Sequence, residues 1–152
     1  MSSVSIQAVS RTFEGHKGQR TQALLPVDFE VRDNDFVTIL GPSGCGKSTL
    51  LRIVAGLDHA TSGRVLLDGV PVEGPGADRG MVFQSYTLFP WLTIEQNIRF
   101  GLRERGMPEA QQKERAAYFI AKVGLRGFEQ HFPKQLSGGM QQRTAIARAL
   151  AN

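Results

Sequence analysis

The chain has 152 residues and a formal net charge of +4, from 18 Lys and Arg against 14 Asp and Glu. This length suits one domain, and contents of 41% apolar and 21% charged residues exclude a disordered tail or a fibrous repeat. One cysteine excludes a disulfide scaffold and a cysteine-based zinc site, and no apolar run approaches the ~18 residues that a membrane span needs.

Five segments have the residue pattern of β-strands: residues 4–8, 27–31, 36–40, the hairpin 64–72 and residues 81–83. The first two alternate apolar and polar residues, which predicts strands with one buried face. Residues 36–40 are almost all apolar, which is typical of a strand buried on both faces of a parallel sheet. Asp68-Gly69 is a strong turn pair and predicts that the hairpin folds there.

Helical spacing follows the strands and predicts four helices. Helical spacing runs over residues 48–57 for the first, and Gly56 is its predicted stop. Thr93 and Gln96 form a capping-box pattern before the second. Pro108 opens the third and Gly124 ends it, and the fourth covers residues 138–152. The apolar positions of these helices are Leu50, Leu51, Val54, Ala55, Ile94, Ile98, Leu102, Ala117, Ile120, Ala121, Ile146, Ala149 and Leu150.

The positive charge lies mainly in the last third of the chain. A basic segment can mark a nucleic-acid or anionic-lipid partner, or it can be a solvated helical surface. The solvated surface is favoured, because the charges are spread through amphipathic patterns and no nucleic-acid-binding signature accompanies them. The sequence therefore predicts no nucleic-acid partner.

Residues 41–48, with the sequence GPSGCGKS, match the G-x-x-x-x-G-K-[ST] pattern of the Walker A phosphate loop. Glycines let backbone N–H groups approach phosphate oxygens, and the helix that follows points its positive end at the same anion. Lys47 supplies a charge for the β- and γ-phosphates, and the Ser48 hydroxyl can ligate Mg²⁺. The loop predicts a nucleoside triphosphate with Mg²⁺, and the resemblance described below makes the nucleotide ATP. The binding residues are Gly41, Pro42, Ser43, Gly44, Cys45, Gly46, Lys47, Ser48 and Thr49, with Lys47 also catalytic.

Simpler explanations of the loop and of its cysteine have to be weighed against the functional ones. A glycine-rich turn with a solvated lysine would have the same composition, but the strand before it and the helix after it favour phosphate binding. Cys45 stands at a variable position of the motif. A small residue that happens to be cysteine is favoured over a nucleophile, because no histidine lies nearby in sequence to activate it.

A second motif, LSGGMQQR, occupies residues 136–143. A serine and two glycines at a helix start form another anion site by their own chemistry. The motif resembles the signature of ABC ATP-binding subunits, LSGGQ followed by a Gln-Arg helix, and it stands in that family's order and separation from the phosphate loop. The resemblance runs from about Val4 to Asn152. Met140 replaces the usual signature glutamine, which leaves Ser137 and Gly139 untouched.

The resemblance implies roles for further residues. Ser137, Gly138 and Gly139 would face the phosphates of a nucleotide. Gln84 would contact Mg²⁺ and the attacking water, and would link the nucleotide site to a transmembrane partner. Phe13 falls where the family places an aromatic residue that stacks on adenine, although a core position would also explain a phenylalanine.

The sequence FPWLT at residues 89–93 looks like the nitrate/sulfonate/taurine branch of importer ATPases. An apolar, aromatic loop outside the core is a surface on which a partner helix would dock. Packing of Phe89 and Trp91 within the helical part of the chain is the alternative.

The resemblance implies an α/β fold: a P-loop NTPase core with a small antiparallel β subdomain and a helical subdomain. It assigns residues 1–84 to the core and β subdomain, 85–135 to the helical subdomain and 136–152 to the signature motif and its helix. No residues match the family's next segment, the Walker B strand and the catalytic glutamate. We therefore expect the N-terminal part of a longer ATPase that lacks the C-terminal part of the core sheet, and that binds Mg·ATP without hydrolysing it as it stands.

The implied function is the ATP-binding subunit that energises an importer of a small anion such as nitrate, a sulfonate or taurine. The implied partners are a permease at residues 84–93, a second copy of the subunit across the nucleotide and, indirectly, a solute-binding protein. Residues 1–13 do not read as a secretory signal, so a cytoplasmic location is expected. The resemblance implies a peripheral position on the inner face of the cell membrane. Two alternatives stay open: a soluble ABC ATPase without a membrane partner, and a non-catalytic nucleotide-binding module.

Overall fold

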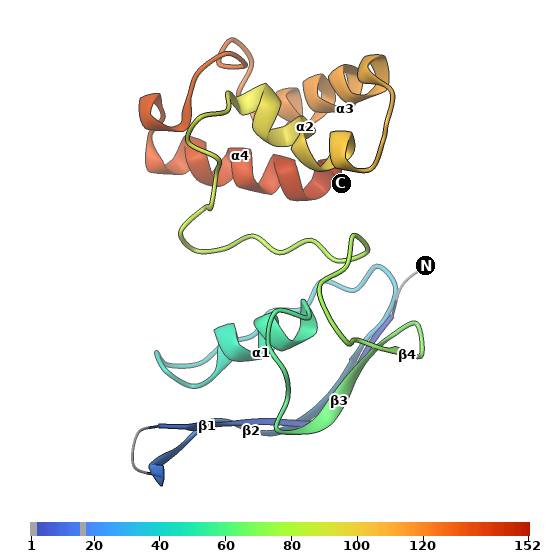
Figure 1. Cartoon of the computed structure of the whole chain (residues 1–152), viewed down its shortest axis with the longest axis vertical. Helices are drawn as coiled ribbons and strands as arrows, with labels where there is room; N and C mark the ends of the chain where they lie inside the picture. Colours follow the sequence, from blue (N-terminus) through green and yellow to red (C-terminus); the bar gives the residue numbers. More distant parts are fainter. Residues whose placement is uncertain (1–2, 16–17) are drawn as a thin grey trace. The chain divides into compact units, whose positions relative to one another are not determined.

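In the computed structural model, which describes residues 3–15 and 18–152, one antiparallel sheet forms the N-terminal part of the chain (Figure 1). Its strands are β1 (Val4–Glu14), β2 (Arg20–Val31), β3 (Ser62–Leu67) and β4 (Val70–Pro71). They are ordered β2-β1-β3-β4. The sheet belongs to a unit that covers Met1–Arg79, and a second unit covers Gly80–Asn152.

The alternation predicted for residues 4–8 is interrupted within β1. Ile6 is buried as expected, but Ala8 is exposed with φ 48°, and Val9 is fully buried in its place. The pairing of β1 with β2 shifts register between Ile6 and Val9, and the Ala8 N–H donates to Asp28 Oδ1 at 2.6 Å. This is a β-bulge, which turns the next side chain to the opposite face.

The hairpin at Asp68-Gly69 is confirmed. Leu67 pairs with Val70 across a two-residue turn, and both turn residues have positive φ, 51° and 80°. Such turns match the right-handed twist of the strands that they join. The half-buried alternation over residues 27–31 is also confirmed, within the longer strand β2.

Two predicted strands are wrong. Residues 36–40 and 81–83 have no regular secondary structure, and Phe36 and Leu40 are 94% and 86% exposed. The apolar run at 36–40 has the composition of a buried parallel strand, but no strand of the described residues pairs with it, and all pairings found there are antiparallel. A strand needs a neighbour for its backbone hydrogen bonds, so composition alone does not form one.

Helix α1 (Lys47–Val54) lies against the sheet of the first unit. Leu50 is buried as predicted, but Leu51 is about half exposed, and Ile53 takes its place in the core. This core also contains Ile6, Val9, Leu24 and Val65. Gly56, with φ 72°, follows the helix end, and an added Cβ would lie 2.1 Å from the Gly74 oxygen. The predicted stop at Gly56 is confirmed.

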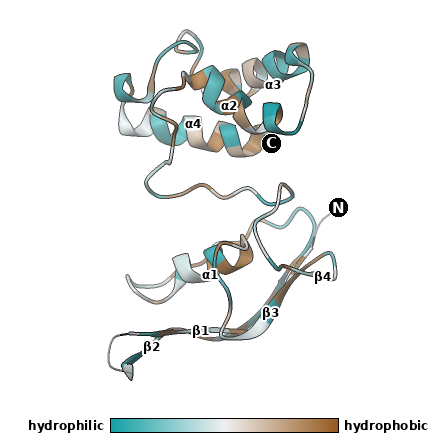
Figure 2. Ribbon diagram, in the orientation of Figure 1, coloured by the Kyte–Doolittle hydropathy of each residue, from teal (hydrophilic) through white to brown (hydrophobic). Residues whose placement is uncertain are grey.

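The second unit contains helices α2 (Ile94–Glu104), α3 (Glu109–Lys122) and α4 (Gly138–Ala151), with a 3-10 turn at Pro133–Gln135. The capping box of Thr93 and Gln96 is present at the start of α2. Figure 2 shows apolar and polar residues alternating along α2 and α4, as expected of amphipathic helices. The buried core of this unit comprises Ile94, Ile98, Leu102, Ala116, Ile120, Leu125, Leu136, Ala147 and Ala151.

The buried faces of α3 and α4 differ from the prediction by one position. Ala117 is exposed and Ala116 is buried, because the buried line of α3 runs through Gln112, Ala116 and Ile120. Leu150 is exposed at the end of α4, where Ala147 and Ala151 face the core. Pro108 is the residue before α3 rather than its first member. No helix of the part of the chain described is long and apolar enough to cross a membrane.

Candidate functional site

Residues 41–46 form a largely exposed loop that leads into α1. The backbone takes left-handed conformations at Gly44 and Gly46, with φ 82° and 96°, which glycine adopts at little cost. The Cys45 N–H donates to the Pro42 oxygen at 3.4 Å. Gly46 is the N-cap of α1, and no side chain of the described residues caps it. The first N–H groups of a helix have no acceptor within the helix, so the loop presents donors to an anion.

The Lys47 ammonium is held by the loop itself. Its Nζ donates to the backbone oxygens of Gly41 and Pro42, both at 2.7 Å, and lies 3.5 Å from Cys45 Sγ. A carbonyl oxygen is a neutral acceptor, whereas phosphate oxygens are charged and form shorter and stronger bonds with an ammonium. A phosphate at the loop can therefore replace these carbonyls as the partner of Lys47.

The glycines of the loop differ in what surrounds them. A Cβ on Gly46 would lie 2.5 Å from the Ala23 oxygen, and one on Gly41 would lie 2.7 Å from Cys45 Sγ. A Cβ on Gly44 would meet nothing within 4 Å. Gly41 and Gly46 thus permit the loop to pack, while Gly44 faces open space from which a ligand can approach.

The donor set for a metal ion is sparse in the described residues. No group of three or more His, Cys, Asp or Glu there could hold a metal. Mg²⁺ in nucleotide sites uses one or two protein oxygens together with phosphates and waters. The Ser48 side chain is exposed in the first turn of α1, next to Lys47, and its hydroxyl fits such a role. Of the other predicted loop residues, Pro42 and Ser43 are exposed and Thr49 is half-buried.

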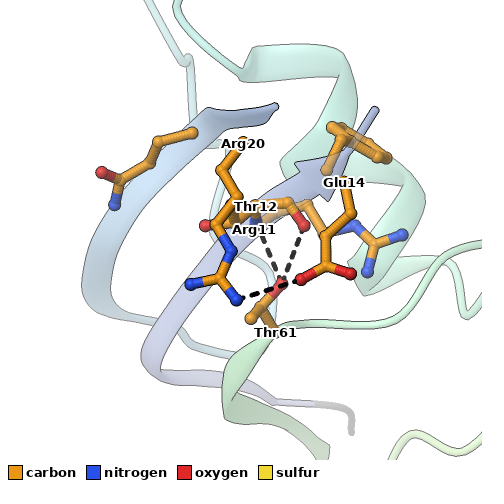
Figure 3. A pocket seen from close by; sticks show the side chains of 7 residues that line it. Arg11, Thr12, Glu14, Arg20 and Thr61 are labelled. Carbon is orange, nitrogen blue, oxygen red and sulfur yellow. Dashed lines mark hydrogen bonds and ion pairs between the residues drawn. The ribbon is translucent and has the colours of Figure 1, made fainter. Parts of the chain in front are cut away.

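A pocket of about 840 Å³ lies where β1 and β2 meet (Figure 3). Phe13 is one of the residues that line it. Thr61 fixes this end of β1, since its hydroxyl accepts from the Thr12 N–H at 3.0 Å and donates to the Thr12 oxygen at 3.3 Å. The Arg11 guanidinium lies 4.6 Å from the centre of the Phe13 ring. Phe13 is 41% exposed, which excludes the core position left open above. One face of the ring contacts Arg11, and the exposed part of the side chain can stack on a planar ligand.

The motif at residues 136–143 begins helix α4. Ser137 is the N-cap, and its hydroxyl oxygen accepts from the Met140 N–H at 3.3 Å. Ser137, Gly138 and Gly139 are all exposed, whereas Leu136 is buried. The positive end of a 14-residue helix therefore faces outward behind a serine and two glycines. This arrangement can bind an anion.

Three side chains fix the start of α4 in its unit. Gln141 Nε2 donates to the Pro133 oxygen at 3.0 Å and to the Leu136 oxygen at 3.3 Å. Arg143 donates to the Val123 oxygen, at the end of α3, at 2.9 Å. The partly buried Met140 packs against the helical core. The methionine thus has a packing role that explains an apolar residue at this position of the motif.

Gln84 is exposed in the irregular segment that precedes α2. Two and three residues after it, Tyr86 and Thr87 have φ of 61° and 47°. A non-glycine residue in this conformation costs about 1–3 kcal/mol and persists only where its surroundings hold it. Arg148 of α4 supplies that hold by donating to the Thr87 oxygen at 2.9 Å, to Thr87 Oγ1 at 3.2 Å and to the Tyr86 oxygen at 3.4 Å.

The sequence left two explanations for Phe89 and Trp91, a docking surface and packing within the helical part of the chain, and each residue fits a different one. The Phe89 ring centre lies 4.4 Å from that of Phe100 in α2, so Phe89 packs within the helical unit. Trp91 is 70% exposed, and the centre of its ring lies 5.8 Å from that of the Phe89 ring. An exposed tryptophan on an aromatic base is a feature of binding surfaces.

Sequence reasoning missed Asn97 and Arg148. Asn97 is fully buried and bonds with the backbone of Phe89, Leu92 and Thr93. The sequence could have predicted this role, because Asn97 lies with Ile94 and Ile98 on the apolar face of α2, where a buried polar side chain needs a hydrogen-bond partner. Arg148 left no such signal, since its hydrogen-bond partners, Tyr86 and Thr87, lie about sixty residues earlier in the sequence.

The candidate residues fall in two groups. The phosphate loop and Phe13 lie in the unit Met1–Arg79, and Gln84 and the motif at 136–143 lie in the unit Gly80–Asn152. A family model described as "ABC transporter" matches residues 24–152. The chain belongs to the ABC transporter family. Both motifs, at residues 41–48 and 136–143, lie within the matched range, whereas Phe13 precedes it.

Relatives of known description support this assignment. An uncharacterised ABC transporter ATP-binding protein of Methanocaldococcus jannaschii is 56% identical over 149 residues, which are 98% of this chain and 55% of that protein. The nitrate import ATP-binding protein of Synechocystis sp. is 49% identical over 148 residues, 97% of this chain and 55% of that protein. The taurine import ATP-binding protein of Burkholderia pseudomallei is 49% identical over 151 residues, 99% of this chain and 58% of that protein. The chain thus spans little more than half the length of the curated relatives it matches.

Solved ABC structures share the fold. An ATP-binding cassette, solved as a dimer in a post-hydrolysis state bound to ADP and Pi, superposes with a TM-score of 0.88 and 36% identity. The match covers 98% of this chain and 69% of that one. The α/β ABC ATPase fold expected from the two motifs is therefore confirmed over the part that this chain represents.

Proposed function

We propose that this ABC chain forms the nucleotide-binding part of an ATP-hydrolysing subunit that energises the import of a small anion such as nitrate, a sulfonate or taurine. One observation carries the proposal: the chain combines a phosphate loop whose lysine is held by exchangeable carbonyls with a serine-capped helix start that faces outward. The printed functions of the nitrate and taurine relatives support the importer assignment.

The residues present fit ATP and Mg²⁺. Lys47 would leave the carbonyls of Gly41 and Pro42 for the β- and γ-phosphates, and the N–H groups of the loop and of the first turn of α1 would bind phosphate oxygens. Bound Mg²⁺ would neutralise charge on the phosphates, with Ser48 and Gln84 as its protein ligands. The proposed nucleotide-binding residues are Phe13, Gly41, Pro42, Ser43, Gly44, Cys45, Gly46, Lys47, Ser48, Thr49, Ser137, Gly138 and Gly139. The proposed catalytic residues are Lys47 and Gln84.

A second copy of the subunit would complete each nucleotide site. Ser137, Gly138 and Gly139 are exposed, so they can face a nucleotide that another copy holds. The dimeric state of the cassette bound to ADP and Pi supports this arrangement. The segment from Gln84 to Thr93, with its exposed Trp91, would contact a permease, which in turn would receive solute from a binding protein. The subunit would then lie at the cytoplasmic face of the cell membrane.

The three parts of the chain would divide these tasks. Residues 1–84 would bind nucleotide as the P-loop core and β subdomain. Residues 85–135 would form the helical subdomain that meets the permease. Residues 136–152 would present the signature motif to the second copy.

Mixing two inactive variants tests the shared site. Lys47→Ala disables the phosphate loop of a copy, and Ser137→Ala disables its signature. In a head-to-tail dimer of one copy of each, one site combines both defects and the other combines both intact halves. With the full-length subunit, we expect ATP turnover and ATP-dependent dimerisation to reappear on mixing, although each variant alone lacks them.

Thr93→Ala is the matched control for Ser137→Ala. Thr93 caps α2 as Ser137 caps α4, by accepting from the backbone N–H three residues later. Loss of either cap costs about 1 kcal/mol of stability. Thr93→Ala should therefore keep its turnover after allowance for the folded fraction. Equal loss in the two cap variants, or no recovery on mixing, would contradict a nucleotide role for Ser137.

A further inference from the structure

The segment around Gln84 is attached to α4 on both sides of that residue. Before Gln84, a Cβ added to Gly80 would lie 3.5 Å from the Ala149 Cβ and oxygen, so the chain passes close to the end of α4. After Gln84, Tyr86 and Thr87 bond with Arg148. The Tyr86 hydroxyl lies near the start of α4, 3.5 Å from where a Gly138 Cβ would be. One helix thus carries both the signature motif and the attachment points of the Gln84 segment.

The attachment depends on the shape of the arginine side chain. Its Nη1 and Nη2 donate in parallel to the oxygen and the hydroxyl of Thr87, and Nη2 also reaches the Tyr86 oxygen. The guanidinium carbon lies 5.6 Å from the centre of the Phe89 ring, which places the cation against an aromatic side chain as well. A lysine has one nitrogen and no planar fork, so it keeps the charge but cannot make this set of contacts together.

The backbone that Arg148 contacts is held away from its preferred conformation. Tyr86 and Thr87 are consecutive non-glycine residues with positive φ. Their N–H groups donate to the Phe83 and Ser85 oxygens at 3.1 and 2.7 Å, and the first of these bonds closes a tight turn that contains Gln84. Burial lowers the pKa of Arg148, but an arginine stays charged in proteins, so the three bonds remain charge-assisted at neutral pH.

We infer that Arg148 is a positioning residue, which holds the left-handed turn at Tyr86 and Thr87 and so ties Gln84 to the helix that carries Ser137, Gly138 and Gly139. The inference rests on the proposed function, which gives Gln84 and the signature their roles at the nucleotide. A displacement of the permease-facing segment then moves α4 with it, and a displacement of α4 moves Gln84.

Arg148→Lys is the informative substitution, because it keeps the charge and removes the fork. Misplacement of a positioned group by about 1 Å can cost up to about 100-fold in rate, so we expect kcat for ATP hydrolysis by the full-length subunit to fall by about tenfold or more. The Kd for Mg·ATP should stay within about twofold, because the phosphate loop is untouched. Amide exchange at Tyr86 and Thr87, measured without nucleotide, should accelerate.

A second substitution separates the proposal from general destabilisation. Glycine adopts positive φ without the Cβ penalty. Thr87→Gly in the Arg148→Lys background should therefore recover much of the lost kcat, although it removes one more hydrogen-bond acceptor. A merely structural role of Arg148 predicts the opposite, namely that the double variant is worse than the single one.

Arg115→Lys is the matched control. Arg115 also donates to a backbone oxygen, that of Ala151, and its guanidinium lies 5.7 Å from the Phe119 ring centre, but it does not contact Tyr86 or Thr87. The Arg115→Lys substitution should therefore leave both the amide exchange at Tyr86 and Thr87 and the kcat unchanged.

The outcomes are distinct for the two proposals. Unchanged exchange at Tyr86 and Thr87 in Arg148→Lys, or no recovery in the double variant, would overturn the inference about Arg148. A wild-type protein that does not bind Mg·ATP would instead overturn the proposed function, whatever the exchange experiment shows.

Discussion

Asn97 Oδ1 accepts a hydrogen bond from the Phe89 N–H at 2.9 Å, and Asn97 Nδ2 donates back to the Phe89 oxygen at 3.2 Å. The same Nδ2 lies 3.0 Å from the Leu92 and Thr93 oxygens. One fully buried side chain on α2 therefore satisfies the backbone of the loop that carries Phe89 and Trp91. The aromatic loop keeps its shape because of this residue and not through strand or helix bonds of its own.

Replacing Asn97 by leucine should destabilise the helical unit. The substitution keeps the volume nearly constant but leaves the Phe89 N–H and several oxygens without the amide, and each unsatisfied buried group costs about 1–3 kcal/mol. We expect the free energy of unfolding to fall by about 2–4 kcal/mol in total. Chemical denaturation followed by helical circular dichroism measures it. Gln142→Ala, at an exposed position of α4, should change it by less than about 0.5 kcal/mol; equal effects of the two substitutions would refute the role of Asn97.

Gly63 and Gly69 provide a matched pair in the sheet. Both have positive φ, 76° and 80°, but a Cβ on Gly63 would lie 2.2 Å from the Ala8 oxygen, whereas one on Gly69 would meet nothing within 4 Å. Gly69→Ala should cost only the conformational penalty of about 1–2 kcal/mol. Gly63→Ala should cost about 1–3 kcal/mol more, because the bulge of β1 must move. Equal losses of stability in the two variants would show that β1 does not approach Gly63 this closely.

Glu129 should make the stability of the helical unit depend on acid pH. Backbone N–H groups, of Glu129 itself and of Gly127 at 3.0 Å, hold the pKa of its carboxyl below the ordinary value of 4.5. The folded state thus favours the charged form, so this contribution is present above pH 4.5 and is lost as the pH falls through the lowered pKa. Glu129→Gln should flatten the fall in melting temperature over this acid range. A wild-type and a variant curve with the same slope would exclude the contribution.

Local signals predicted much of the fold. The turn at Asp68-Gly69 and the capping box of Thr93 and Gln96 depend on residues at most three positions apart, and both formed as predicted. The glycine loop before α1 and the serine cap of α4 are local in the same sense. For this reason the positions of the loop at residues 41–46 and of the capped start of α4 could be predicted from the sequence.

Features that depend on distant partners could not be read in the same way. Residues 36–40 have the composition of a buried strand, but a strand forms only beside another, and the described sheet offers it none. The bulge at Ala8 depends on Asp28, twenty residues later, and on Gly63. The turn at Tyr86 and Thr87 depends on Arg148, more than sixty residues later in the chain. In each case the deciding contact is long-range.

The central claim is that Mg·ATP binds at the phosphate loop through Lys47, and titration calorimetry of the wild type and of Lys47→Ala tests it most directly. A hydrogen bond to a charged group contributes about 1.5–3 kcal/mol, and every 1.4 kcal/mol is tenfold in affinity, so Lys47→Ala should weaken binding by about 10- to 100-fold. Lys113→Ala, which removes an exposed lysine paired with Glu109 on α3, should bind as the wild type does. The same Kd for wild type and Lys47→Ala, or no binding heat from the folded wild type, would contradict the claim.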